Sequence, residues 1–417
     1  MLRGMAELFE SSVLLSAVMI VRDEAHELPD CLATLRDVVD EIVVYDTGSI
    51  DDTRELARAA GAVVVEGFWD DDFGRARTAA AEAASGVWLL VVDADERLVA
   101  NVVAVRALLG EERAADGFSV RIDNAAAADG SAGYAHWGNR LVRRGAVHWV
   151  GALHEQPLTP AGVEPVLDTM PGHLLSLEHL GYADPERVRR KAARNALLAQ
   201  AHLDELTSSG AADPLTVAEA LLNLGRSLIG AGRQQDAVDT FETVREIAPG
   251  TQAWNEATDH LARVLLGAGH DELVVLLSAQ LCEAGVDPRY CDWLRAQALA
   301  QLGQPEEALR LVRGVDELID PAGRRYDLGQ VLEVRSLLAA LLGLHDEALA
   351  TLALAVARHG RIRGRGPMLL ELWGSAPPMG LASIVRQSGS PAHLGAVAQE
   401  LRGSGGAGPE VAAALAG

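Results

Sequence analysis

Short apolar segments alternate with longer amphipathic segments up to residue 92, and this alternation restricts the fold more than any other feature of the sequence. Segments of this length are typical of strands joined by right-handed crossover helices in a parallel sheet. We therefore predict an α/β N-terminal domain with a mostly parallel sheet. The predicted strands lie at 14–21, 42–45, 62–65 and 88–92, and the predicted helices begin near residues 28, 49 and 75.

Apolar spacing and turn residues define the first two predicted helices. Ser49 and Asp52 have the spacing of a capping box, which predicts the start of the second helix. The first helix places apolar side chains at helical spacing, so we expect one face of it to be buried. These side chains are Leu28, Cys31, Leu32 and Leu35.

Aspartates follow two of the predicted strands. Asp46 ends the second strand, and Asp93 and Asp95 follow the fourth. In such sheets ligands bind outside the carboxyl ends of the strands. Paired aspartates also suit Mg²⁺ or Mn²⁺ bound together with substrate phosphates. The alternative is that Asp-x-Asp only opens a loop, and that Asp46 serves the turn that follows it.

The charge balance limits the classes of partner. Asp and Glu number 59 against 36 Lys and Arg, a formal net charge of −23, which disfavours nucleic acid and anionic lipid surfaces. The three cysteines lack zinc or disulfide-framework spacing. The apolar run at 13–21 is too short to span a bilayer and has no signal-peptide cleavage site. We predict a cytoplasmic chain without a membrane span.

Helical periodicity replaces the strand pattern from residue 184 onward. Leu224, Gly225, Ala237 and Phe241 have tetratricopeptide-repeat spacing. This predicts an all-α, tetratricopeptide-like (TPR-like) domain at 184–360, whose concave surface could bind a peptide or another subunit. A buttress for the first domain and a homodimer surface are the alternatives. Turn glycines recur at Gly232, Gly269, Gly303 and Gly343, and a small or apolar residue lies five places after each.

The last part of the chain, 361–417, is predicted as C-terminal helices with a flexible tail. Residues 361–366 resemble a linker, and short helices are expected at 367–373, 381–386 and 392–401. Residues 403–408 are too rich in glycine for us to expect order there.

A series of motifs runs through the first half of the chain, at 17–24, 28–32, 43–53, 72–77, 93–96, 140–143, 151–155 and 179–182. Taken together, these motifs resemble the family 2 glycosyltransferases of the GT-A fold, whose sheet is Rossmann-like. The resemblance covers about 13–183, which we take as a catalytic domain at 1–183. Within this family, the sequence most resembles a subgroup that joins the catalytic domain to helical repeats. This subgroup includes the peptide S-glycosyltransferases of glycocin-type peptides.

This resemblance implies inverting, metal-dependent transfer of a sugar from a nucleotide-sugar donor, here a UDP-sugar, to a peptide or protein side chain. Asp46 would bind the base or ribose, and Arg77 would support the donor near its sugar or phosphates. Asp93 and Asp95 would be the DxD motif, which contacts the ribose and a Mn²⁺ or Mg²⁺ on the diphosphate. His179 would approach the metal and diphosphate, unless it is only a domain-junction histidine.

On the acceptor side, the resemblance points to Glu155, with His154 beside it, as the base. The alternative for this pair is a loop salt bridge or hydrogen bond. Two residues depart from the family pattern, because Asp23 and Thr78 stand where asparagine is usual. These departures leave open a non-catalytic TPR scaffold with a relic transferase domain, and a glycan or lipid-linked acceptor is a further alternative.

A basic stretch opens the helical half of the chain. Its default interpretation is a solvated helix face, and the functional alternative places it near the donor diphosphate or an acidic acceptor. The stretch comprises Arg187, Arg189, Arg190, Lys191 and Arg194.

Overall fold

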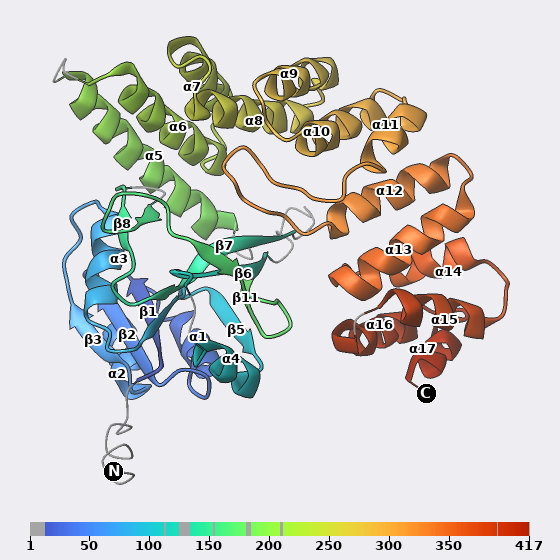
Figure 1. Ribbon diagram of the computed structural model, residues 1–417, viewed down its shortest axis with the longest axis horizontal. Coiled ribbons are helices and arrows are strands. Elements are labelled where there is room, and N and C mark those ends of the chain that lie inside the picture. The colour runs from blue at the N-terminus through green and yellow to red at the C-terminus, as the bar shows by residue number, and fades with distance from the viewer. Residues whose placement is uncertain are drawn as a thin grey trace, which may run out of the picture. The chain divides into compact units, whose positions relative to one another are not determined.

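The computed structural model describes residues 13–111, 114–124, 134–152, 155–180, 185–208, 212–389 and 391–416. The chain divides into two compact units (Figure 1). The first runs to Glu205 and includes Gly230–Gly232, and the second comprises Leu206–Ile229 and Arg233–Gly417. The division therefore falls within helix α5 (Pro185–Ser208). The three-part division at 183 and 360 stays a prediction.

A nine-stranded sheet forms the centre of the first unit, in the order β3-β2-β1-β4-β7-β6-β11-β5, with β10 beside β6. Strands β1 to β4 are parallel neighbours, whereas β7 runs antiparallel to both β4 and β6. The strands are β1 (Leu15–Val21), β2 (Glu41–Asp46), β3 (Val63–Glu66), β4 (Trp88–Val91), β5 (Glu96–Ala100), β6 (Gly117–Asn124), β7 (Tyr134–Arg143), β10 (Leu167–Thr169) and β11 (Leu175–His179).

Helices cover both faces of this sheet, as alternating apolar side chains of β1 require. Met19 belongs to a core cluster with residues of α1 (Leu28–Leu35) and α4 (Val102–Leu109). Val18 belongs to another cluster, with Ala81 of α3 (Phe73–Glu82) and Trp149. The face predicted for α1 is fully buried. Trp149 lies in β8 (His148–Val150), which pairs with β9 (Gln156–Leu158).

The predicted capping box of α2 (Thr53–Ala59) is wrong. Asp52 occupies the N-cap position without a side-chain hydrogen bond. The Ser49 hydroxyl instead accepts from the Asp23 backbone N–H at 2.9 Å, because the loop after β1 lies against the turn after β2.

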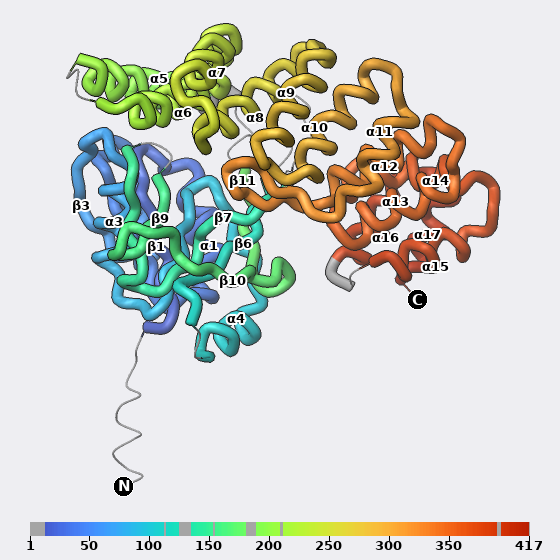
Figure 2. The backbone as a smooth tube through the Cα atoms, turned by 45° about the horizontal axis from the view of Figure 1, so that its top comes forward, coloured from blue at the N-terminus to red at the C-terminus, as the bar shows by residue number. Residues whose placement is uncertain are grey.

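The second unit is a stack of antiparallel helices, which confirms the predicted all-α repeat domain (Figure 2). The four predicted turn glycines all adopt left-handed backbone, with φ between 72° and 77°. The first helices are α6 (Pro214–Gly230), α7 (Gln234–Ile247), α8 (Gln252–Gly267), α9 (Asp271–Glu283), α10 (Pro288–Gln301), α11 (Pro305–Val312), α12 (Gly329–Leu341) and α13 (His345–His359).

Buried small residues let these helices approach closely. The residues five places after the turn glycines (Ala237, Val274, Ala308 and Ala348) are fully buried. Gly225 of α6 lies so close to the Phe241 ring of α7 that an added Cβ would overlap the ring.

Helices α14 (Gly366–Trp373), α15 (Pro378–Ser388) and α16 (Pro391–Gly403) match the three predicted C-terminal helices. The prediction of a loose tail is wrong, because α17 (Gly408–Ala416) follows the glycine-rich turn. Its Val411, Ala412 and Leu415 are buried in the core that contains Leu352 of α13. Burial of these three apolar side chains, which lie at helical spacing, stabilises α17 despite the glycines that precede it. Of the helices that the structure describes, none combines the length and apolar character needed to cross a membrane.

Candidate functional site

The carboxyl ends of β1, β2 and β4 bring the predicted aspartates to one edge of the sheet. Asp46 is the last residue of β2 and pairs in register with Val21, the last residue of β1. Asp93 and Asp95 follow directly after β4, the other neighbour of β1. The sequence-based placement of the acidic residues at this edge therefore agrees with the structure.

Asp46 offers a buried, unsatisfied acceptor. It is 1% exposed, and its Oδ1 accepts from the backbone N–H groups of Gly48 and Ser49 at 3.0 and 2.9 Å. Gly48 has a φ of 110°, which makes this turn dependent on glycine. Among the described residues nothing hydrogen-bonds Asp46 Oδ2. A buried carboxylate oxygen without a partner is costly, so it suits a ligand that donates an N–H or O–H.

Arg140 of β7 joins two acidic side chains of the β4–β5 turn. Its Nη2 donates to Asp93 Oδ2 at 2.9 Å and to Glu96 Oε1 at 2.8 Å. Burial alone would raise the pKa of Asp93, but the charges of Arg140 and Arg77 hold it well below its usual range. For Glu96, burial prevails over the Arg140 charge and, with the repulsion of Asp93, raises the pKa to about 7.

Asp95 lies between an imidazole and an ammonium group. His179 Nε2 is 3.6 Å from Asp95 Oδ1, and Lys191 Nζ of α5 is 3.4 Å from Asp95 Oδ2. Burial opposes ionisation, but the interactions with His179 and Lys191 lower the pKa of Asp95 to about 2. His179 Nδ1 is 2.9 Å from Asn124 Oδ1, which directs the other ring nitrogen to Asp95. Burial disfavours the charged ring, yet Asp95 raises the pKa of His179.

Arg77 connects the predicted acceptor side to this cluster. Its Nε donates to Glu155 Oε1 at 2.7 Å, and its Nη2 lies 3.6 Å from Asp93 Oδ1. Its Nη1 is buried and has no hydrogen-bond partner among the described residues. Of the predicted pair, Glu155 thus lies in the cluster, whereas His154 lies outside the described residues.

The two departures from the family pattern have structural uses. Asp23 adopts left-handed backbone and its Oδ1 accepts from the Ile50 N–H at 2.8 Å, which fixes the turn after β2. The Thr78 hydroxyl accepts from the Trp149 N–H at 3.0 Å and donates to the carbonyl oxygen of the same residue at 3.4 Å. Thr78 therefore joins α3 to β8.

Sequence reasoning assigned no role to Glu96, Asn124 or Arg140. Arg140 belonged to a recognised motif, but nothing in the sequence indicated that β7 inserts beside β4. The sequence did indicate Lys191, because it belongs to the basic stretch at the start of the helical half. In the structure its Nζ lies 3.4 Å from Asp95 Oδ2.

The donor set fits a divalent cation only in part. An Asp95 carboxylate beside the His179 imidazole offers oxygen and nitrogen ligands that suit Mn²⁺. Among the described residues, no three His, Cys, Asp or Glu side chains form a complete metal site. The residues therefore suit a metal whose remaining ligands come from a bound substrate, as phosphate oxygens provide for Mg²⁺ and Mn²⁺.

Comparison with known proteins finds similarity to glycosyltransferases and to a repeat-containing protein. Residues 16–145 match the family model described as Glycosyl transferase family 2. The chain is 55% identical over 84 residues to a TPR repeat-containing protein of Synechococcus elongatus (20% of this chain, 21% of that protein). It is 33% identical over 84 residues to an uncharacterized glycosyltransferase of Rickettsia felis (20% and 29%). It is also 33% identical over 79 residues to the SPbeta prophage-derived glycosyltransferase SunS of Bacillus subtilis (18% and 19%). The chain thus spans less than a third of the length of each of these relatives.

Proposed function

We propose that this chain, whose residues 16–145 match the family 2 glycosyltransferase model, moves a sugar from a nucleotide-sugar donor, with a divalent cation, to a peptide or protein side chain. The observation that carries the proposal is the convergence of Asp46, Asp93 and Asp95 at the carboxyl ends of neighbouring strands, with Asp46 Oδ2 buried and unsatisfied. A nucleotide sugar offers base and ribose donors for Asp46 and a diphosphate for the second cluster.

We assign the donor roles on the basis of the contacts. Asp46 Oδ2 accepts from the base or ribose, and the unpartnered Nη1 of Arg77 donates to the donor near its phosphates. Asp95 and His179 would hold Mn²⁺ or Mg²⁺. When bound, the metal would supply positive charge to neutralise the leaving diphosphate. Asp93, fixed by Arg140, is held ready to accept from a ribose hydroxyl.

Glu155 is our candidate base on the acceptor side. Arg77 holds its Oε1, which orients the carboxylate at the edge of the cluster. A base there takes the acceptor proton as the acceptor attacks the anomeric carbon on the side opposite the diphosphate. A thiol ionises more easily than a hydroxyl, so a cysteine acceptor depends less on Glu155.

We assign the repeat array to recognition of the acceptor. Stacked helix pairs leave an extended concave surface, which suits an extended peptide better than a single sugar. The resemblance to enzymes that modify peptides and that carry similar repeats supports the same choice.

A binding screen tests the donor part of the proposal. Thermal shifts with UDP, GDP and their sugars are compared with and without Mn²⁺. We expect a metal-dependent shift for the wild-type chain. In Asp46→Asn the amide can keep its oxygen on the Gly48 and Ser49 N–H groups but turns an N–H donor to the ligand, which lowers affinity at least about tenfold.

Glu66→Gln is the matched control, because Glu66 ends the neighbouring strand and is exposed. It should bind nucleotides as the wild type does. A wild-type chain that binds none of the panel under any metal condition contradicts the proposal and favours the relic scaffold.

A further inference from the structure

We infer that Lys191 of α5 binds the diphosphate of the donor, so that a helix beyond the family-matched residues 16–145 completes the site. This inference rests on the proposed function. Lys191 Nζ lies 3.4 Å from Glu24 Oε1 and 3.4 Å from Asp95 Oδ2, and it therefore joins the ends of β1 and β4.

The charge of the site calls for such a cation. Six acidic side chains lie among the described residues of the site, and a diphosphate adds more negative charge. Arg77 and Arg140 are mostly buried and are each held by two carboxylates. The acidic side chains are Glu24, Asp46, Asp93, Asp95, Glu96 and Glu155.

Lys191 differs from these arginines in its freedom to move. Its side chain is 45% exposed, and its two ion pairs are longer than close hydrogen-bonded pairs. A lysine carries three donors on a flexible stem, so a small rotation can move the ammonium group from carboxylates to a phosphate. A divalent cation bound to Asp95 would weaken the attraction that keeps Lys191 on that carboxylate.

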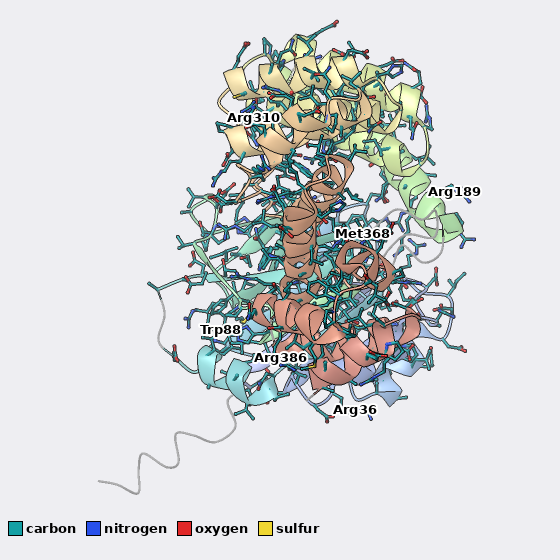
Figure 3. The ribbon with its side chains drawn as sticks, turned by 90° about the vertical axis from the view of Figure 1, so that its right-hand side faces the viewer. Arg36, Trp88, Arg189, Arg310, Met368 and Arg386 are labelled. Atoms are coloured by element: carbon teal, nitrogen blue, oxygen red, sulfur yellow. The ribbon has the colours of Figure 1, made fainter. Side chains whose placement is uncertain are left out.

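A second contact places α5 at this edge. The Arg194 guanidinium lies over the Phe73 ring at 5.8 Å, one turn of α5 beyond Lys191. Phe73 is the first residue of α3, the helix that carries Arg77. The position of Lys191 beside Asp95 is thus supported from the same helix. Arg189 and Arg190, by contrast, are exposed residues of α5. Arg189 is labelled in Figure 3.

Calorimetry of UDP binding and of uridine binding, both in Mn²⁺, tests the inference. GDP and guanosine replace these ligands if the wild type prefers guanine. Lys191→Met keeps the apolar stem and removes the charge. We expect at least about tenfold weaker UDP binding, as for loss of one charge-assisted contact, and unchanged uridine binding. Lys191→Arg should recover most of the affinity. Arg190→Met, the control on the same helix, should match the wild type.

Two results would overturn the inference. Equal UDP affinity of Lys191→Met and the wild type would show that Lys191 does not touch the diphosphate. Parallel loss of UDP and uridine binding would show that Lys191 only supports the fold. In both cases the wild type still binds the nucleotide, which separates them from failure of the proposed function, where the wild type binds neither diphosphate.

Discussion

Glu96 provides a test of the site's electrostatics that does not depend on substrate. It is 1% exposed, and its oxygens accept from Arg140 and from the Asp93 N–H. Its pKa rises from an ordinary 4.5 to about 7 in the folded chain. An acid whose pKa is raised by folding favours the folded state only while protonated. Its contribution to stability is therefore complete below pH 4.5 and is lost as the pH rises through 7.

The magnitude follows from that shift. A rise of the pKa from 4.5 to about 7 corresponds to about 3 kcal/mol, most of which falls between pH 5 and pH 8. Glutamine is neutral throughout and lacks this dependence. Glu96→Gln also replaces one acceptor with a donor, which costs roughly 1–3 kcal/mol at every pH. We expect a clearly destabilised variant at pH 5 and a near-neutral one at pH 8.

Urea unfolding followed by tryptophan fluorescence at both pH values measures the difference. Trp88 of β4 is fully buried in the core of the first unit and reports on the unfolding of that core. Glu82→Gln, at the exposed end of α3, is the control and should change stability by the same small amount at both pH values. The reasoning is refuted if the difference between Glu96→Gln and the wild type is independent of pH.

Three further substitutions probe packing and chemistry. Gly225→Ala should lower stability by roughly 1–3 kcal/mol, because the added Cβ overlaps the Phe241 ring. Gly267→Ala is the control and should not lower stability, because nothing lies within 4 Å of its added Cβ. Thermal unfolding compares the two variants, and equal melting temperatures would contradict this packing. In Gly74→Ala the Cβ would lie 2.9 Å from two carbonyl oxygens of the β8 segment, so α3 must shift and calorimetry should show weaker nucleotide binding. Glu155→Gln should slow transfer to a serine peptide at least about 100-fold and to the matching cysteine peptide less, and equal losses would count against Glu155 as the base.

Local chemistry made much of the fold predictable. The apolar spacing of α1 correctly predicted its buried face, and glycines at turn positions correctly indicated the helix pairs of the array. Parallel strands share the edge at which they end, so Asp46, Asp93 and Asp95 could be placed together before their contacts were known.

What could not be predicted depends on which segments meet. The contact of Arg140 with Asp93 requires β7 to lie antiparallel to β4, and periodicity does not specify a strand's neighbour. Ser49 has the spacing of a helix cap, but the loop holding Asp23 competes for its hydroxyl. Lys191 could not be distinguished from a solvated lysine, because its role depends on how α5 docks within the first unit.

The most direct test of the account is the release of nucleoside diphosphate from a panel of UDP- and GDP-sugars in Mn²⁺. We predict slow turnover of at least one donor by the wild-type chain and at least about 100-fold slower turnover by Asp95→Asn. Asp52→Asn, an exposed aspartate that makes no capping bond, should match the wild type. Equal turnover by Asp95→Asn and the wild type, or no turnover of any donor, would contradict a glycosyltransferase centred on Asp95.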